Sequence, residues 1–187
     1  MKCYCYDYLL SNKSLKEQLE AIKHDIENIL FIKNPCLEVQ LAAVKQNGYA
    51  IQYIDTPCLE VQIEAVKQNG YAIQNIDTPC LKVQLAAVNN TSDCIRLIEN
   101  PFKEAKLLSV RKNGYNIRFI KNPCLELQIE SVKEYFKSIK YCHNKDDILL
   151  NYYNYDMIEY LDDANYLFSD EFLNSENYKK YLLEKTI

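Results

Sequence analysis

The sequence AVKQNGYAIQ occupies residues 43–52 and occurs again, without a change, at residues 65–74. The prolines keep the same interval, because each of the five lies 22 residues after the last: Pro35, Pro57, Pro79, Pro101 and Pro123. The three glycines follow the same rule and fall thirteen residues after a proline: Gly48, Gly70 and Gly114. A fixed period of this size is typical of a solenoid, in which each repeat packs on its neighbours.

A copy without proline precedes Pro35. Residues 13–32, KSLKEQLEAIKHDIENILFI, keep the apolar spacing of the later units. We therefore predict an N-terminal segment at 1–12, a repeat array at 13–144 and a C-terminal segment at 145–187. The repeats start near residues 13, 35, 57, 79, 101 and 123.

Each repeat carries signals for the ends of a helix. Asn or Thr stands before every proline, which predicts an N-cap followed by proline at the first helical position. These residues are Asn34, Thr56, Thr78, Asn100 and Asn122. The helix is expected to end at Asn-Gly, where glycine supplies a left-handed cap. The remaining segment of about six residues predicts a second, short helix packed back on the first.

The helical wheel supports this interpretation. One broad apolar arc holds Leu37, Val39, Gln40, Leu41, Ala43 and Val44, and the opposite side holds Glu38, Ala42 and Lys45. The predicted fold is all-α: a right-handed α-solenoid of about six 22-residue helix-turn-short-helix repeats with a C-terminal helical cap. A strand-containing solenoid is the alternative, but the strand pattern of leucine-rich repeats is missing.

The units LEVQLAAVKQNGYAIQYI and LEVQIEAVKQNGYAIQNI resemble the "LAAVxQNGxAL" repeats of an uncharacterised domain-of-unknown-function family. Its members occur as tandem helical repeats in bacterial, phage and protist-virus proteins. The resemblance extends over residues 37–142, and the unit that starts near residue 79 departs from it where NNTSDC replaces KQNGYA. It implies an interaction solenoid and supplies no activity or catalytic residue.

Residues 22 apart form columns on one surface of such a fold. A basic column contains Lys23, Lys45, Lys67, Arg111 and Lys133, with Asn89 as the exception. Because Glu64 and Glu130 stand three residues before a basic residue, we interpret the column mainly as a solvated face with internal pairing. An acidic protein partner or a nucleic acid is the alternative ligand.

Two further columns are interpreted as structural. Gln18, Gln40, Gln62, Gln84 and Gln128 lie in the apolar arc, where they are expected to bond each other or the neighbouring backbone. Cys36, Cys58, Cys80 and Cys124 are expected to pack as small apolar side chains. Cys3 and Cys5, with His24 and His143, are too few to predict a metal site.

Tyrosines follow the glycines at Tyr49, Tyr71 and Tyr115, where packing is favoured over a role as partner anchors. The repeat pattern is least regular at residues 89–106. We interpret this break as a bend in the array, with a specialised contact patch as the alternative.

The C-terminal segment differs in charge from the repeats. From Asp146 onward ten acids and three lysines give −7, whereas residues 1–145 carry +3. The segment is too rich in tyrosine and aliphatic residues for a disordered tail, so we expect two or three capping helices. Its candidate partner-binding residues are Asp156, Glu159, Tyr160, Asp162, Asp163, Asp170 and Glu171.

The chain lacks glycine-rich phosphate loops, nucleophile elbows and histidine-rich motifs, so we predict a non-enzymatic protein without cofactor or metal. Its expected role is to bind a macromolecule, most simply a protein, with direct nucleic-acid binding disfavoured. The candidate cations for this role are Lys45, Lys67, Arg111 and Lys133.

Two alternatives remain open. One is a phage or mobile-element inhibitor of host defence whose acidic surface blocks a nucleic-acid-binding groove. The other is a sponge that binds small nucleotides. The sequence lacks a long apolar run and a signal-peptide pattern, which predicts a cytoplasmic location, in a host cell if the gene is viral.

Overall fold

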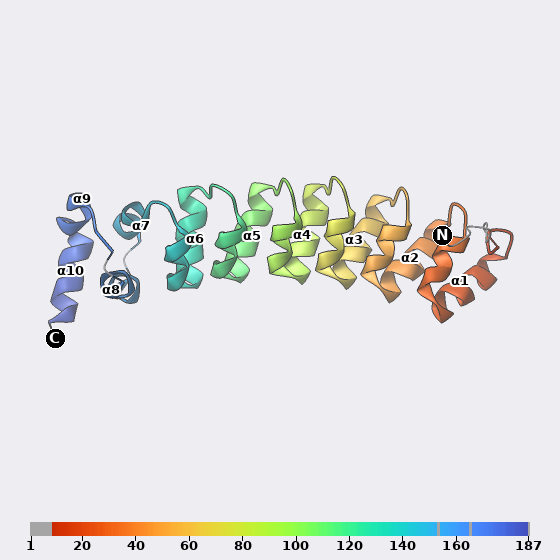
Figure 1. Ribbon diagram of the computed structural model, residues 1–187, viewed down its shortest axis with the longest axis horizontal. Coiled ribbons are helices and arrows are strands. Elements are labelled where there is room, and N and C mark those ends of the chain that lie inside the picture. Colours follow the sequence, from red (N-terminus) through yellow and green to blue (C-terminus); the bar gives the residue numbers. More distant parts are fainter. Residues whose placement is uncertain (1–8, 153, 165, 187) are drawn as a thin grey trace, which may run out of the picture. The chain divides into compact units, whose positions relative to one another are not determined.

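The computed structural model describes residues 9–152, 154–164 and 166–186. It divides into two compact units, Met1–Ala105 and Lys106–Ile187, which we call the N-unit and the C-unit and describe separately. Every regular element in the described ranges is a helix, and none of them is a strand (Figure 1). The prediction of an all-α repeat protein is therefore confirmed.

Each repeat pairs an α-helix with a short 3-10 helix. The N-unit contains α1 (Leu15–His24), η1 (Ile26–Phe31), α2 (Leu37–Gln46), η2 (Gly48–Tyr53), α3 (Leu59–Gln68), η3 (Gly70–Asn75), α4 (Leu81–Asn90) and η4 (Ser92–Leu97). Helix α5 (Lys103–Lys112) starts in the N-unit and ends in the C-unit. The C-unit continues with η5 (Gly114–Phe119), α6 (Leu125–Glu134) and η6 (Phe136–Tyr141). The predicted short second helix is thus a 3-10 helix, whose tighter turn covers more distance per residue.

The α-helices begin two residues later than the sequence suggested. The N-cap of α2 is Cys36, whose carbonyl accepts from the amide of Gln40, while Asn34 lies in the preceding loop. The Pro35 carbonyl accepts instead from the side chain of Gln40 at 2.8 Å. The prediction of an Asn or Thr N-cap with proline at the first helical position is therefore wrong. Asn34 has φ 52°, a left-handed conformation that asparagine tolerates better than most residues.

The glycines are required by close packing and not by a left-handed cap. No glycine of the described residues has a positive φ, and the residue that ends α2 is Asn47 in an extended conformation. A Cβ atom on Gly48 would lie 2.4 Å from the carbonyl oxygen of Ala65 in the next repeat. The Gly48 amide also donates to the side chain of Gln68 at 2.7 Å. The predicted left-handed glycine cap is wrong because the following repeat, and not local backbone strain, restricts this position.

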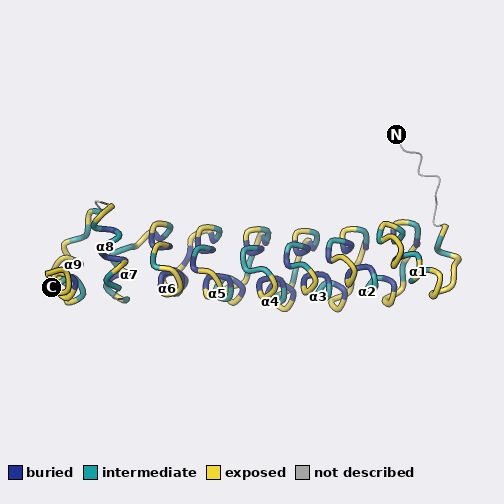
Figure 2. The backbone as a smooth tube through the Cα atoms, turned by 90° about the horizontal axis from the view of Figure 1, so that it is seen from below, coloured by how far each residue is buried: buried dark blue, intermediate teal, exposed yellow. Residues whose placement is uncertain are grey.

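Part of the core consists of positions that keep one residue type from repeat to repeat. In the N-unit, Val44, Val66 and Val88 are fully buried, and Ile51 and Ile73 nearly so. Buried stretches of the chain recur along the repeats (Figure 2). Leu37, by contrast, is 42% exposed, so its assignment to the buried arc is wrong. Leu37 is the first residue of α2, so no preceding turn of the helix covers its side chain.

The glutamine column connects successive loops. Gln40, Gln62, Gln84 and Gln128 each donate to the carbonyl of the proline five residues earlier. In the N-unit the buried Gln84 also accepts from the amide of Phe102, at 2.9 Å. The expected structural ladder is confirmed, with its bonds made to backbone and not between glutamines.

Four helices follow the last repeat of the C-unit: α7 (Lys145–Asn151), α8 (Tyr155–Asp163), α9 (Asp170–Leu173) and α10 (Glu176–Lys185). Their buried residues Leu149, Met157 and Phe172 form one cluster with Val132 and Ile139 of the preceding repeat. The acidic segment is therefore a helical cap with an apolar core. In the ranges that the structure describes, no helix has both the length and the apolar character needed to cross a bilayer.

The glycine contact gives a first prediction. Gly48→Ala places a methyl group against the Ala65 carbonyl and should lower the free energy of unfolding by about 1–3 kcal/mol, as overpacking does elsewhere. Urea denaturation measures this change. Gln52→Ala alters an exposed residue of the same 3-10 helix and should change stability by less than about 0.5 kcal/mol. Equal effects of the two substitutions would contradict the packing role of the glycine.

The glutamine ladder gives a second prediction. Gln84→Leu leaves both the Phe102 amide and the Pro79 carbonyl without their partner, and should cost about 2–3 kcal/mol. Gln62→Leu removes one bond, to Pro57, from a half-buried position and should cost about 1 kcal/mol. Thermal and urea unfolding of the two variants compares them. A larger loss for Gln62→Leu would be inconsistent with the ladder.

Candidate interaction surfaces

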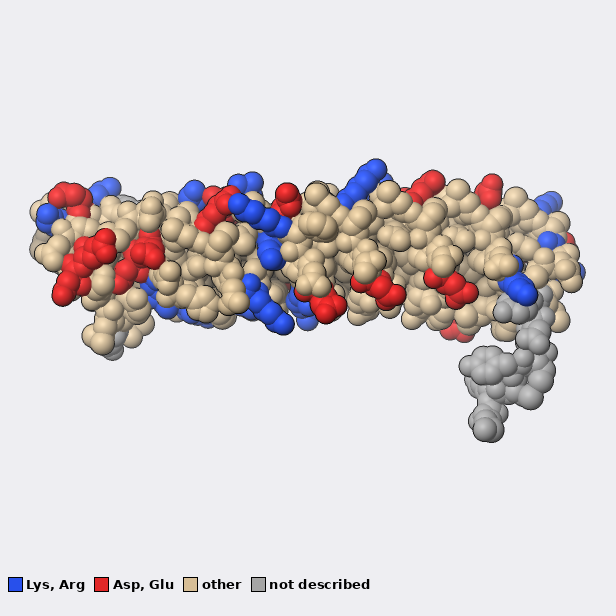
Figure 3. Space-filling view, turned by 90° about the horizontal axis from the view of Figure 1, so that it is seen from above, with Lys and Arg blue, Asp and Glu red and all other residues tan. Residues whose placement is uncertain are grey.

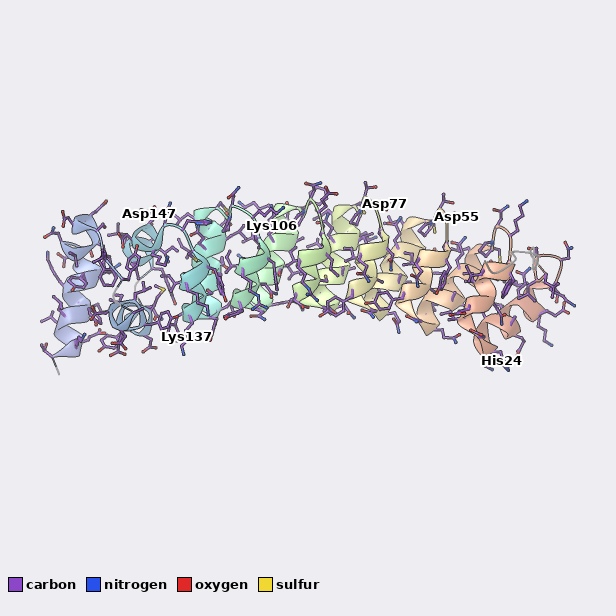
Figure 4. All side chains as sticks on the ribbon, in the orientation of Figure 1. His24, Asp55, Asp77, Lys106, Lys137 and Asp147 are labelled. Atoms are coloured by element: carbon purple, nitrogen blue, oxygen red, sulfur yellow. The ribbon has the colours of Figure 1, made fainter. Side chains whose placement is uncertain are left out.

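The repeats present two edges. In the N-unit, Asp55 and Asp77 lie at the edge formed by the loops between repeats, and His24 lies at the opposite edge, where α1 ends (Figure 4). Acidic side chains recur at intervals along the loop edge (Figure 3). The exposed acids of these loops and of the helix starts beside them are Glu38, Asp55, Glu60, Asp77, Glu99 and Glu104. This regular spacing follows from the 22-residue repeat and does not by itself define a site.

The basic column is exposed in the N-unit and paired in the C-unit. Lys45 and Lys67 are exposed, and neither forms an ion pair with another described residue. Arg111 of α5 and Lys133 of α6 both contact the Glu130 carboxylate, at 2.8 and 3.1 Å. Hydrogen bonds first from Arg111 and then from Lys133 lower the pKa of Glu130. The predicted internal pairing is therefore present at these two cations.

A second basic column lies on the 3-10 helices, and the sequence analysis missed it. The residues at this repeat position are Leu30, Gln52, Gln74, Arg96, Arg118 and Lys140, so the position changes from uncharged to basic along the chain. In the C-unit the guanidinium of Arg118 lies 4.6 Å from the centre of the Tyr115 ring, and the ammonium of Lys140 lies 5.1 Å from it. Listing this position repeat by repeat would have revealed the change.

Tyr115 is the centre of this cluster. The Tyr141 hydroxyl donates to the Tyr115 hydroxyl at 2.9 Å, and the two rings meet edge to face with 5.1 Å between centres. Hydrogen bonding to Lys140, the largest effect, lowers the pKa of Tyr115, and hydrogen bonding to Tyr115 raises the pKa of Lys140. Lys140 therefore stays charged at neutral pH.

The irregular repeat that starts near residue 79 makes its own contact with the preceding repeat. Asp93 stands where three other repeats have tyrosine, at Tyr49, Tyr71 and Tyr115, and its carboxylate accepts from the Tyr71 hydroxyl of the preceding repeat at 2.8 Å. Arg96 lies 3.8 Å from the Asp93 carboxylate. The Asp93 hydrogen bond raises the pKa of Tyr71. This departure from the repeat therefore makes a specific contact within the N-unit, while the bend stays a prediction.

The cysteine column is exposed and not packed, so that prediction is wrong. Cys36, Cys58, Cys80 and Cys124 are the N-caps of their helices and lie at the exposed helix starts. Burial raises the pKa of Cys94 to about 12 and that of Cys142 to about 11, so these two thiols stay protonated. No group of three His, Cys, Asp or Glu side chains in the described ranges is arranged to hold a metal ion. Cys3 and Cys5 lie outside the described residues.

The predicted acids of the cap divide into two groups. The Asp162 carboxylate accepts from Lys185 at 2.7 Å and from the Tyr181 hydroxyl at 3.0 Å, and Glu159 accepts from the Tyr155 hydroxyl at 3.3 Å. The Asp162 contacts join α8 to α10, whereas Tyr155 and Glu159 both belong to α8. The exposed acids are Asp156, Asp163, Asp170 and Glu171. Tyr160 is half-buried, with its ring edge to face against Phe136.

Two grooves lie between successive loops of the N-unit. One, of about 410 Å³, is lined by Lys33, Gln40, Tyr53 and Asp55 among others, and the second, of about 310 Å³, includes Asp77 and Glu99. A nucleotide phosphate needs several converging cations, whereas the first groove has one lysine and the second has none. These grooves therefore give the sponge hypothesis no support.

The geometry defines a helical-repeat protein with charged, exposed columns. Residues 36–82, which include α2, η2, α3 and η3, match the family model described as a domain of unknown function, DUF4116. The resemblance predicted from the sequence is confirmed over this stretch. No curated protein and no solved structure matches the chain.

The Asp162 contacts give a third prediction. Hydrogen bonds first from Lys185 and then from Tyr181 lower the pKa of Asp162 below its ordinary value of 3.8. The ionised Asp162 carboxylate therefore stabilises the fold at neutral pH. Asp162→Asn should lower the free energy of unfolding by about 0.5–1 kcal/mol at pH 7, a small value because both side chains are partly exposed. The difference should disappear as the pH falls below about 4.

Urea denaturation as a function of pH measures this dependence. Asp163→Asn is the matched control, because it removes the same charge from the neighbouring exposed residue. It should leave stability unchanged within about 0.5 kcal/mol. A pH-independent loss in Asp162→Asn would show that the carboxylate charge does not hold the two helices together.

Proposed function

We propose that this protein is a non-enzymatic helical-repeat protein that binds a protein partner through side chains on the exposed surfaces of its repeats. The supporting observation is the contrast between buried and exposed repeat positions. Two buried positions are uniform over five repeats: Val44, Val66, Val88, Val110 and Val132 occupy one, and Ile51, Ile73, Ile95, Ile117 and Ile139 occupy the other. Exposed positions change in charge along the chain, as the position of Gln52, Gln74, Arg96, Arg118 and Lys140 does.

This contrast separates scaffold from recognition. Uniform valine and isoleucine positions maintain the stacking of repeats, so they are expected in any solenoid. A change from glutamine to arginine at an exposed position leaves these buried valine and isoleucine positions unchanged. It alters the charge presented to a partner, which governs specificity and association rate.

The titratable groups support binding more than catalysis. Glu130, Asp162 and Tyr71 have displaced pKa values, and each is held by hydrogen bonds between neighbouring elements. Displaced pKa values of this kind belong to structural networks as well as to active sites. Each of the three side chains is already hydrogen-bonded to a side chain of a neighbouring element, so none of them supplies a reactive group to a cavity.

A defence inhibitor is a narrower form of the same proposal. The exposed acids of the cap are the observation that favours it, because Asp156, Asp163, Asp170 and Glu171 present negative charge to solvent. Asp162 belongs to the internal contacts of the cap, so it should be left intact when the mimicry hypothesis is tested.

Affinity capture tests the proposal and is the fourth prediction. The immobilised chain should retain a protein from a lysate of the source cells, and a panel of mononucleotides should leave its melting temperature unchanged. The combined variant Asp156→Asn, Asp163→Asn, Asp170→Asn and Glu171→Gln should weaken this capture only if the cap contributes to recognition. Stabilisation by a nucleotide together with the absence of a captured protein would overturn the proposal.

A further inference from the structure

Two cations of the C-unit are fixed next to one aromatic ring. Arg118 of η5 and Lys140 of η6 occupy the same position in consecutive repeats. The 3-10 helices η5 and η6 pack directly against each other. Both charges lie within about 5 Å of the centre of the Tyr115 ring. Arg118 also lies 4.5 Å from the ring centre of Phe119, and Lys140 lies 5.0 Å from that of Tyr141. We call Arg118 and Lys140 the cation pair.

These ring contacts prepare the cation pair for binding. A free arginine or lysine side chain loses conformational entropy when it is immobilised by a ligand, and this loss weakens association. Cation–π contacts with Tyr115 restrict both side chains before any ligand arrives. Both residues are nevertheless exposed, so their charges remain accessible.

The cation pair has no carboxylate partner in the part of the chain that the structure describes. Neither residue forms an ion pair there, and η5 and η6 contain no Asp or Glu. In the N-unit the situation differs, because Arg96, at the same repeat position, lies 3.8 Å from Asp93 of its own 3-10 helix. The positive charge supplied by Arg118 and Lys140 is therefore left for a ligand.

The C-unit itself shows how two cations one repeat apart hold a carboxylate. Arg111 and Lys133 also occupy one position in consecutive repeats, and the Glu130 carboxylate contacts them at 2.8 and 3.1 Å. One carboxylate can thus bridge cations of neighbouring repeats in this fold.

We propose that Arg118 and Lys140 bind a carboxylate of an acidic segment in the protein partner, in the way that Arg111 and Lys133 hold Glu130. This inference rests on the proposed role as a protein-binding repeat protein and names its surface. Packed helices lie about 8–10 Å apart. A peptide in the polyproline II conformation rises about 9 Å in three residues and brings every third side chain back to the same face. A segment with an acid at every third position therefore matches the repeat.

The aromatic rings favour an acidic peptide over a single-stranded nucleic acid. Nucleic-acid bases bind such surfaces by stacking on accessible ring faces. Arg118 and Lys140 both lie against Tyr115, and the rings of Tyr135 and Tyr141 pack at its sides with 5.6 and 5.1 Å between centres. Tyr115 is thus engaged in holding the cations and offers little of its ring for stacking.

The test replaces the cation pair by the residue that the fold already carries at this position. Gln52 and Gln74 stand there in η2 and η3, so the variant Arg118→Gln/Lys140→Gln should keep the 3-10 geometry. The probe is a fluorescein-labelled peptide with glutamate at every third position, and fluorescence anisotropy measures its affinity. The double variant should bind it about tenfold more weakly, as expected for the loss of two exposed ion pairs.

Matched controls separate this surface from general charge attraction. Lys16→Gln/Lys82→Gln removes the same two charges from exposed positions of the N-unit that belong to neither basic column, and should change the affinity by less than about twofold. The same peptide with glutamine in place of glutamate should not bind. Circular dichroism of both double variants establishes that they remain folded.

Three results of the peptide and oligonucleotide assays would overturn the inference. These are equal affinity of the wild type and Arg118→Gln/Lys140→Gln for the glutamate peptide, no measurable binding of that peptide, and tighter, variant-sensitive binding of an oligothymidylate of equal charge, which would assign the surface to nucleic acid. Capture of the natural protein partner at full strength by this folded variant would also reject the cation pair while leaving the proposed function intact.

Discussion

In the three repeats that carry glycine, the stacking is limited by the close approach of this glycine to a carbonyl of the following α-helix. At Gly48 and Gly70 a Cβ atom would come within 2.4 and 2.7 Å of the carbonyl oxygens of Ala65 and Ala87. Hydrogen bonds from the same glycine amides to Gln68 and Asn90 fix the neighbouring repeats to each other. Burial of the valine and isoleucine columns supplies the apolar driving force, and the glycine contact limits how the helices meet.

This stacking leaves three kinds of exposed surface, each with its own chemistry. The loop edge of the N-unit carries regularly spaced acids, and the C-unit carries cations supported by Tyr115. The cap adds acids to the C-unit, but its Asp162 serves to join α8 and α10. A repeat protein can therefore change its surface charge one repeat at a time without changing the buried positions.

Sequence reasoning found the repeat, its helices and its glutamine ladder because each depends on regular spacing. It misplaced the helix starts because Asn-Pro is a common sign of a capped helix, whereas Pro35 here precedes the cap at Cys36. It also misjudged the cysteines, since their small apolar side chains suit a core equally well. The cation pair was missed because its ring contacts join separate repeats, at Tyr115 and Lys140.

The sequence by itself determined the period, the all-helical class and the acidic cap, because proline and glycine spacing, apolar periodicity and charge are local properties of the chain. Only the tertiary structure decided which contact requires each glycine, which carboxylates already pair with a cation, and which cations have no carboxylate partner among the described residues. Those answers depend on atoms contributed by the next repeat. A column of charges read from the sequence cannot distinguish Arg111, which holds Glu130, from Arg118, which rests on Tyr115.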